Sequence, residues 1–408
     1  YDHLGFRKIL PGTSHVKLNK SKFGESLKSH FKFGYEYSDC WVDDSRLVIL
    51  NAVDASLRGA DIQNYCKVTK VEKSDGLWSI TTTNTIDGKK NIYQTKCFIN
   101  ASGPWVDDIL QNSFEKKNSK NVRLVRGSHI VVSKLFEHDR SFICQNNDNR
   151  IFFMIPYEDK YTLIGTTDID HGHSAGKVEI SEEEKLYICK SANEYLKTEI
   201  NLKDIVWSYS GVRPLYDDGA SAAQEATRDY VIKAEEQEST LMINIFGGKI
   251  TTYRRLSESI LKHIEAFFGK RGNSWTDQSY LPGGNIGVDG HLDLENKIQM
   301  RYPFLTKETI KRLVRSYGTI SFDIFGDAEN IDSLGRDFGS GLYEREVNYL
   351  IQEEWSRTSD DILFRRSKLG LSFSKDQVKK LDQFLDEFFK ASSQSKNDEL
   401  KSKMVEAL

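Results

Sequence analysis

The chain has 408 residues, a formal net charge of −3 and a sequence pI near 6.4. Hydrophobic residues make up 38% and charged residues 29%, which is typical of a soluble globular protein and argues against a disordered or membrane-spanning one. The charge argues against a general polyanion binder, no basic stripe indicates nucleic-acid binding, and no apolar stretch approaches the roughly 20 residues that cross a bilayer. The five cysteines are scattered and form no CxxC pair. They favour a reducing cytoplasmic compartment over a disulfide framework or a zinc site.

Residues 43–100 predict a helix followed by short strands. Asp44-Ser45 can cap the helix, and Gly59 can end it. Two Asp-Gly turns further on are typical of an antiparallel meander. The expected order is helix, strand, meander, strand, which indicates an α/β domain with a small β insertion. The apolar positions of the helix include Leu47, Val48 and Leu57, and the expected strands lie around Ile62 and over Cys66–Lys73, Leu77–Thr83, Asn91–Thr95 and Cys97–Ile99.

Residues 121–245 are expected to be β-rich. Ser181-Glu182-Glu183-Glu184 has the spacing of a capping box, and it precedes an amphipathic helix with Leu186, Cys189 and Leu196 on its apolar side. The expected strands are Ser128–Val132, Ile151–Ile155, Tyr161–Thr166 and Leu241–Phe246.

From about Ser274 the pattern becomes helical. One helix carries Ile310, Leu313, Val314 and Tyr317 and ends at Gly318. A last helix begins at a Ser374–Gln377 capping box and carries Val378, Leu381, Leu385 and Phe388, before a polar tail, Ala391–Lys403, that is expected to fray at its start. These apolar stripes fit internal packing better than a homodimer interface, although a homodimer stays open.

Two glycine-containing turns are candidate cofactor sites. Phe98–Trp105 and Phe246–Arg254 each run from an apolar strand through small residues into a helix. Glycine lets a backbone approach a ligand closely, and N–H groups at a helix start attract negative charge. A flavin carbonyl, where negative charge grows on reduction, would suit the second turn, and Lys249 adds a cation there. A tight turn or a glycine hinge without a ligand is the alternative, and two such turns in one chain make it less attractive.

Cations and a histidine form a second group of candidates. Arg213 and Arg228 present planar forks suited to phosphate, although either one alone is more commonly a surface charge. His129 begins an apolar run, where it is either a hydrogen-bonded structural residue or a base for a hydroxyl proton. His171 and His173 follow two carboxylates, but the segment reads as a solvated loop, and no metal site is expected.

These segments together resemble the flavin-dependent glycerol-3-phosphate dehydrogenase family, most closely its aerobic bacterial enzymes. The resemblance covers nearly the whole chain, and its motifs follow the family's order. The matching runs are Gly34–Asp44, Asn100–Trp105, Arg126–Val132, Ile164–Asp168, Tyr209–Leu215, Thr227–Tyr230, Phe246–Arg254, Leu281–Gly284 and Arg301–Leu305.

The resemblance implies a mixed α/β (α+β) fold with three domains. A β-rich substrate domain would comprise residues 1–42 and 121–243. A Rossmann-like FAD-binding domain of the glutathione-reductase and D-amino-acid-oxidase type, with its N-terminal part missing, would comprise 43–120 and 244–273. Residues 274–408 would form the helical domain.

The resemblance also implies a reaction. Hydride would pass from C2 of sn-glycerol 3-phosphate to FAD, giving dihydroxyacetone phosphate, and a membrane quinone would take the electrons, with the protein peripheral on the cytoplasmic face of the membrane. Carried onto this sequence, His129 becomes the base or hydroxyl partner, and Arg213, together with Lys249, belongs to the catalytic centre. Substrate contacts fall on Arg213, Arg228, Thr166 and Thr167. Cofactor contacts fall on Ala101, Ser102, Gly103, Trp105, Gly247, Gly248, Lys249, Ile250, Thr251 and Thr252.

One family feature is absent from the sequence: the strand-GxGxxG-helix unit that binds the ADP half of FAD. Gly335–Gly341 has glycines but follows no predicted strand. The chain is therefore expected to bind FAD weakly or not at all by itself. A glycerol-3-phosphate oxidase that uses oxygen, and a non-catalytic protein that binds phosphate ligands, are the alternatives. The chain retains both the flavin-side turn and the arginines. This argues against the non-catalytic protein, which would have little use for the turn.

Overall fold

The computed structural model describes residues 10–114, 120–172, 176–217 and 229–406. Its contacts divide the chain into two compact units. The first contains residues 1–40 and 65–274, and the second contains residues 41–64 and 275–408. The predicted substrate and flavin segments thus share one unit, while residues 41–64 pack with the helical region. The functional division into a substrate domain and a flavin domain stays a prediction.

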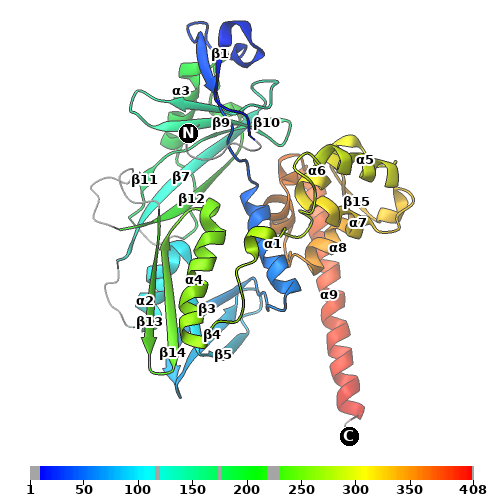
Figure 1. The fold of residues 1–408 in the computed structure, drawn as a ribbon. Coiled ribbons are helices and arrows are strands. Elements are labelled where there is room, and N and C mark those ends of the chain that lie inside the picture. Colours follow the sequence, from blue (N-terminus) through cyan, green and yellow to red (C-terminus); the bar gives the residue numbers. More distant parts are fainter. Residues whose placement is uncertain (1–9, 115–119, 173–175, 218–228, 407–408) are drawn as a thin grey trace. The chain divides into compact units, whose positions relative to one another are not determined.

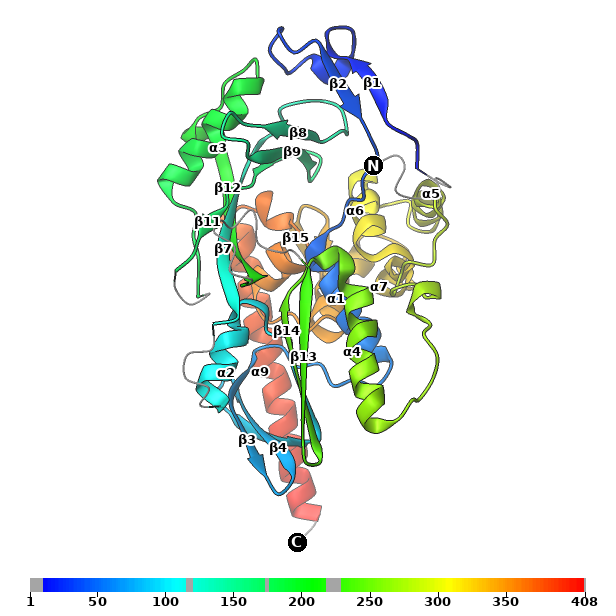
Figure 2. The same cartoon turned by 60° about the vertical axis from the view of Figure 1, so that its left-hand side comes forward.

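An antiparallel sheet of six strands forms the larger part of the first unit, with strand order β11-β7-β10-β9-β8 and β12 also paired with β7. Figures 1 and 2 show helix α3, Glu182–Tyr195, beside this sheet. Its Ile188 and Cys189 pack on Ile130 and Met154 of the sheet in one buried cluster. The strands are β7 (Val122–Ser133), β8 (Phe142–Gln145), β9 (Ile151–Tyr157), β10 (Tyr161–Gly165), β11 (Ile169–Asp170) and β12 (Ile205–Tyr216).

The predicted capping box of α3 is confirmed: Ser181 and Glu184 exchange side-chain and backbone hydrogen bonds. The predicted apolar side is partly wrong. Cys189 and Leu196 are buried, but Leu186 is 44% exposed, and Ile188 and Ala192 take its place in the core. Ile188, rather than Leu186, is therefore the residue of this turn that packs on the sheet.

The second part of this unit is a mixed sheet in the order β13-β14-β6, in which β14 and β6 run parallel. Trp78 of the predicted meander packs on Phe98 and Met242 of this sheet. Helix α4 lies beside the β13–β14 hairpin in both views (Figures 1 and 2). The elements are β3 (Cys66–Ser74), β4 (Leu77–Asn84), β5 (Lys90–Thr95), β6 (Cys97–Asn100), α2 (Val106–Phe114), β13 (Tyr230–Gln237), β14 (Thr240–Gly247) and α4 (Tyr253–Phe268), with a separate pair, β1 (Ser14–Lys17) and β2 (Phe33–Glu36).

The meander of β3, β4 and β5 and the strands of the β-rich region are confirmed. The strand expected around Ile62 is wrong, because Ile62 lies outside any strand between α1 and β3.

The second unit is helical and has one large core. Ile310, Leu313, Val314 and Tyr317 are buried as predicted, and so are Leu381 and Leu385. The polar tail expected to fray is instead helical, since the last helix runs to Glu406 and extends past the other helices of this unit (Figure 1). The elements are α1 (Asp44–Leu57), α5 (His291–Arg301), α6 (Lys307–Tyr317), α7 (Ser321–Phe325), a hairpin of β15 (Asp337–Gly339) and β16 (Leu342–Tyr343), α8 (Glu344–Gln352), a π-helix (Asp361–Arg366) and α9 (Lys375–Glu406).

Helix α1 differs most from its prediction. Val48 is 60% exposed and Leu57 is 73% exposed, whereas Arg46 and Val53 are buried. Arg46 can be buried because Glu354 accepts two hydrogen bonds from its guanidinium, at 2.5 and 2.8 Å. A buried charge needs such a partner.

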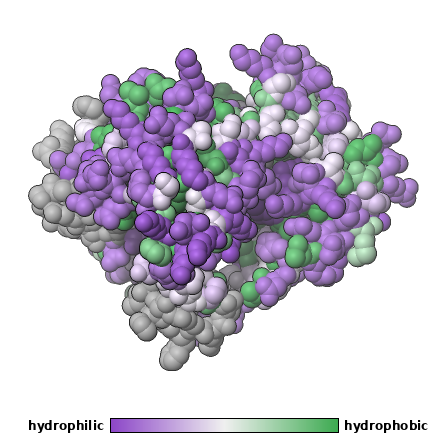
Figure 3. Space-filling model, turned by 90° about the horizontal axis from the view of Figure 1, so that it is seen from above, coloured by the Kyte–Doolittle hydropathy of each residue, from purple (hydrophilic) through white to green (hydrophobic). Residues whose placement is uncertain are grey.

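In the described part of the chain, every helix is too short or too polar to cross a bilayer. On the face seen in Figure 3, hydrophobic residues form small groups among hydrophilic ones.

Candidate flavin and substrate site

The two predicted cofactor turns lie at the same end of neighbouring strands. Asn100 at the end of β6 pairs in register with Asn244 of β14, 144 residues further along the chain. The Asn100 Nδ2 atom donates to Asn244 Oδ1 and to the carbonyl of Val106, at 3.1 Å in both cases. Both asparagines are buried. This amide pair holds Ala101–Trp105 and Gly247–Thr252 beside one another at the carboxyl ends of two parallel strands, where α/β sheets commonly bind ligands.

The second turn has a shape that only glycine permits. Gly247 and Gly248 have φ angles of +69° and +100°. A Cβ on Gly247 would lie 2.9 Å from the carbonyl oxygen of Asp229. A 3₁₀ turn, Ile250–Thr252, follows and leads into α4, and Lys249 at its N-cap makes no side-chain capping hydrogen bond. A bare backbone with uncapped N–H groups fits the carbonyl edge of a flavin, so the residues present suit the cofactor.

A histidine occupies the middle of the six-stranded sheet, on the face opposite α3. Along β7, His129 alternates with Ser128 and Ile130, which face the helix. In register, His129 lies between Gly165 of β10 and Tyr209 of β12. The imidazole stacks on Tyr209, with ring centroids 5.0 Å apart, and a Cβ on Gly165 would lie 2.4 Å from its Cδ2 atom. Gly165 therefore makes the room that the ring occupies.

The His129 imidazole is uncharged at neutral pH. Burial, reinforced by the nearby positive charge of Arg213, lowers the pKa of His129 to about 4. Its Nδ1 atom is buried and has no hydrogen-bond partner among the described residues. A buried polar atom without a partner is uncommon and calls for an explanation such as a bound ligand. A neutral imidazole with a free nitrogen can accept a proton.

Arg213 lies on the same face, on β12. Its Nη1 donates to Asp168 Oδ1, and its Nη2 donates to Thr166 Oγ1 at 3.1 Å. The guanidinium lies against Gly127, where a Cβ would be 2.6 Å from Nη2. Gly127 precedes His129 by two residues on the same face of β7, so the cation and the neutral imidazole are neighbours.

Thr167 points the other way. Its hydroxyl donates to Glu184 Oε1 at 2.9 Å and accepts from the Ser128 N–H at 3.0 Å. Glu184 is 3% exposed and also accepts from the Ser128 hydroxyl, the Ser181 N–H and Arg126. The two adjacent threonines, both predicted as substrate contacts, therefore face opposite sides of the sheet. Thr166 contacts Arg213, while Thr167 bonds to Glu184 on the side of α3.

The remaining predicted residues have different surroundings. Ala101, Lys249, Ile250 and Thr251 are exposed, and Trp105 is 48% exposed. Arg228 and His173 lie outside the described residues, and His171 follows β11 in a loop.

The sequence patterns assign no role in the site to Asp168 or to Tyr209, which the structure places beside Arg213 and His129. The signal for Asp168 was its position directly after Thr166-Thr167 at the end of a buried strand.

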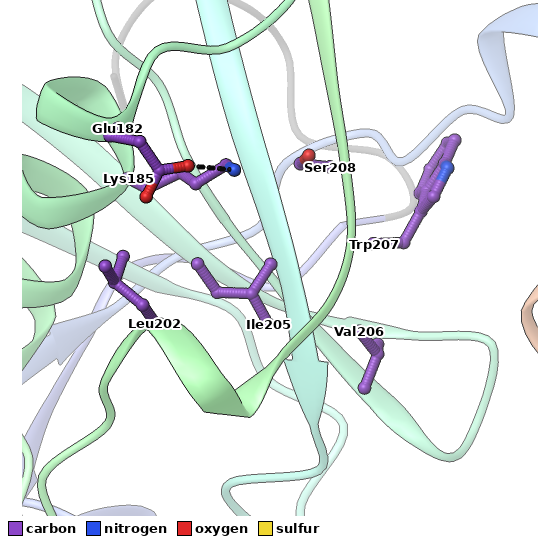
Figure 4. A pocket seen from close by; sticks show the side chains of 7 residues that line it. All are labelled: Glu182, Lys185, Leu202, Ile205, Val206, Trp207 and Ser208. Carbon is purple, nitrogen blue, oxygen red and sulfur yellow. Dashed lines mark hydrogen bonds and ion pairs between the residues drawn. The ribbon is translucent and has the colours of Figure 1, made fainter.

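A shallow hollow of about 360 Å³ lies elsewhere in the first unit, and none of the predicted site residues lines it. Figure 4 shows the paired Glu182 and Lys185 on one side of it and Trp207 on the other. It is lined by Glu182, Lys185, Leu202, Ile205, Val206, Trp207 and Ser208.

Comparisons with known proteins identify the family of the chain. The family described as FAD dependent oxidoreductase matches residues 9–254, and the C-terminal domain of alpha-glycerophosphate oxidase matches residues 274–398. The chain is 40% identical over 368 residues to D-erythritol 1-phosphate dehydrogenase of Brucella abortus, which covers 90% of this chain and 73% of that protein. It is 38% identical over 389 residues to the aerobic glycerol-3-phosphate dehydrogenase of Escherichia coli, covering 95% and 77% of the two chains.

A solved structure of glycerol-3-phosphate dehydrogenase from Bacillus halodurans, complexed with FAD, superposes with a TM-score of 0.70. It shares 21% identity, and the match covers 92% of this chain and 81% of that one, which supports the fold. This superposition confirms the mixed α/β fold with a helical C-terminal region, and the family match confirms the FAD dependence. The chain belongs to the family of FAD-dependent oxidoreductases that includes the glycerol-3-phosphate dehydrogenases.

Proposed function

We propose that this protein oxidises the C2 hydroxyl of sn-glycerol 3-phosphate to the ketone of dihydroxyacetone phosphate. The observation that carries the proposal is the pairing of Arg213 with an uncharged His129 on one face of one sheet. A phosphorylated alcohol needs both a cation for its phosphate and a base for its hydroxyl proton. The names of the two relatives above both specify a phosphorylated polyol.

Each residue has a distinct part in the proposed reaction. Arg213 binds phosphate oxygens through its planar fork, and Thr166 lies beside that fork. His129 takes the hydroxyl proton at its free nitrogen, held in orientation by the Tyr209 ring. Arg228 is proposed as a second phosphate ligand on the strength of the family motif alone.

The cofactor is assigned to the paired turns. Ala101, Ser102, Gly103 and Trp105 on one side, and Gly247–Thr252 on the other, would hold FAD. Bound FAD supplies the acceptor for the hydride that leaves the carbon atom. Lys249, exposed at the N-cap, would place its positive charge beside the flavin and the substrate.

A quinone is proposed as the final electron acceptor, with the protein peripheral on the cytoplasmic face of the membrane. The name of the E. coli relative, which calls it a dehydrogenase and not an oxidase, favours an acceptor other than oxygen. Oxygen is the second candidate, because the C-terminal match takes its name from an oxidase. D-erythritol 1-phosphate is the second candidate substrate, because a relative named for it is 40% identical.

The test is an anaerobic assay of the protein, supplied with excess FAD, with a soluble ubiquinone analogue as the electron acceptor. Glycerol 3-phosphate, D-erythritol 1-phosphate and unphosphorylated glycerol are compared as substrates. Quinone reduction with glycerol 3-phosphate, and none with glycerol, is the expected result. Faster turnover of D-erythritol 1-phosphate would show that this ester, and not glycerol 3-phosphate, is the preferred substrate. Oxygen uptake with peroxide release but no quinone reduction would show that oxygen is the electron acceptor. Equal rates with glycerol and its phosphate would contradict the role of Arg213.

A further inference from the structure

We propose that Asp168 occupies the place on Arg213 that the phosphate of the substrate takes, so that an anion binds only by displacing this carboxylate. The proposal rests on the function proposed above, in which Arg213 is the phosphate ligand. Asp168 is then a specificity-determining residue, because it sets how strongly charged a ligand must be to enter.

Both amino groups of Arg213 already donate a hydrogen bond within the chain. One amino group donates to the Asp168 carboxylate and the other to the Thr166 hydroxyl. A carboxylate and a phosphate present the same pattern of acceptor oxygens to a guanidinium. The two anions therefore compete for one donor set.

The guanidinium of Arg213 has little room to turn and present other N–H groups to a ligand. Its guanidinium lies on the backbone of Gly127, where even a Cβ would approach Nη2 to 2.6 Å and Cζ to 2.8 Å. The sheet beneath thus blocks movement of the cation in that direction. The exchange must then occur on the side where Asp168 lies.

The Asp168 side chain can leave while its backbone stays in place. Its neighbour Thr167 is fixed by the hydroxyl bonds to Glu184 and Ser128 and by a backbone bond from the Thr167 N–H to the Ser128 carbonyl, at 3.4 Å. The side chains of Arg213 and Asp168 are 41% and 25% exposed, so water reaches the pair. An ion pair that water reaches is weak, and a phosphate dianion can displace it.

Displacement makes the site selective for charge. A neutral polyol interacts with Arg213 too weakly to separate it from Asp168, whereas a dianion binds Arg213 more strongly than one carboxylate does. The released carboxylate remains beside the bound ligand and can accept a hydrogen bond from a hydroxyl group.

Inorganic phosphate is the probe for this competition, with binding measured by isothermal titration calorimetry at fixed pH and salt. Asp168→Asn removes the competing charge but keeps the side-chain size. Asp170→Asn is the matched control: it removes the same charge two residues away, from an exposed pair with Arg123. Long-range electrostatics change nearly equally in the two variants.

Asp168→Asn is expected to bind phosphate about 3- to 10-fold more tightly than the wild type, and Asp170→Asn to stay within about twofold of it. Equal affinities in the two variants, or weaker binding in Asp168→Asn, would overturn the proposal, and so would a lack of phosphate binding by both the wild type and Asp168→Asn. Near-UV circular dichroism checks that each variant is folded, and Asp168→Ala serves as a second variant.

Arg213→Met separates this proposal from the one on which it rests. Loss of phosphate binding in Arg213→Met supports Arg213 as the phosphate ligand whatever Asp168→Asn does. Unchanged binding in Arg213→Met would instead remove Arg213 from the proposed substrate site.

Discussion

The imidazole of His129 and the phenol ring of Tyr209 lie nearly parallel, at 10°, with their centroids 5.0 Å apart. On the other side of the imidazole is Gly165, which has no side chain to occupy that space. The ring is therefore held between a flat aromatic surface and a bare backbone. Its orientation depends on both neighbours, and one of them can be changed with a single methyl group.

Gly165→Ala tests whether the position of this ring matters for turnover. The new Cβ would lie 2.4 Å from His129 Cδ2, so the imidazole must move. Small displacements of a reacting group are costly, and we expect kcat to fall by roughly 10- to 100-fold. Gly272→Ala is the control, since Gly272 lies outside this sheet and a Cβ there meets nothing within 4 Å. Similar kcat values in the two variants would show that the ring position is unimportant.

The low pKa of His129 predicts a particular pH profile. A base must be neutral to accept a proton, and burial together with Arg213 lowers the pKa of His129 to about 4. In the FAD-loaded enzyme, kcat/KM should be insensitive to this group from pH 7 to about 5 and fall only as the pH drops through about 4. Ionisation of the phosphate of the free substrate also affects kcat/KM at about pH 6, so the deciding quantity is kcat at saturating substrate: an inflection of kcat near the ordinary histidine pKa of 6.5 would contradict the assignment.

His129→Ala should lower kcat by roughly 10²- to 10⁴-fold if this residue is the base. His138 provides the control, because burial also lowers its pKa, yet it stacks on Phe136 away from the site. His138→Ala should reduce the free energy of unfolding without a comparable loss of turnover.

Local patterns were enough to predict the elements that carry the site, but not their partners. The Asp-Gly turns and the capping box at Ser181 depend on residues a few positions apart, and the structure confirms them. The pair Asn100–Asn244 joins residues 144 positions apart, and Arg46 meets Glu354 across 308. No helical or strand period encodes such pairs. For that reason the apolar positions of α1 do not predict that this helix buries Arg46.

The hydrogen bonds that join Glu184 of α3 to Ser128 and Thr167 of the sheet are expected to be sensitive to acid. Burial alone would raise the pKa of Glu184, but hydrogen bonds from Ser181, Ser128 and Thr167, with the charge of Arg126, lower it below 4.5. A lowered carboxyl pKa means that this stabilisation is present above about pH 4.5 and is lost as the pH falls through the lower, folded-state pKa. Glu184→Gln should therefore flatten the dependence of stability on pH in this range.

At pH 7, Glu184→Gln should reduce the free energy of unfolding by about 1–3 kcal/mol, because an amide group replaces an oxygen that accepts from two donors. The neighbouring Glu182→Gln is the control. Its side chain is 65% exposed and pairs with Lys185 at the surface, so the change should stay within about 0.5 kcal/mol. Urea unfolding of both variants at pH 7 and pH 4 measures the difference. A pH dependence in Glu184→Gln identical to that of the wild type would exclude this role.

The buried pair of Arg46 and Glu354 predicts non-additive mutations in the helical unit. Arg46 also donates through Nε to the carbonyl of Ser316 and lies over the ring of Tyr317, 4.9 Å from its centroid. Glu354→Leu leaves the buried guanidinium without its counterion, and Arg46→Met leaves the carboxylate without its own. Each single change should cost about 3–5 kcal/mol of unfolding free energy.

The double variant Arg46→Met/Glu354→Leu should be much more stable than the sum of the two losses, because no unpaired charge remains. Asp54→Asn, which breaks the exposed pair of Arg58 and Asp54 on the same helix, should cost no more than about 0.5 kcal/mol. Urea unfolding of the four variants and the wild type completes the cycle. Additive losses would mean that the two side chains contribute independently, and the ion pair would then not be what fixes α1 to the helical unit.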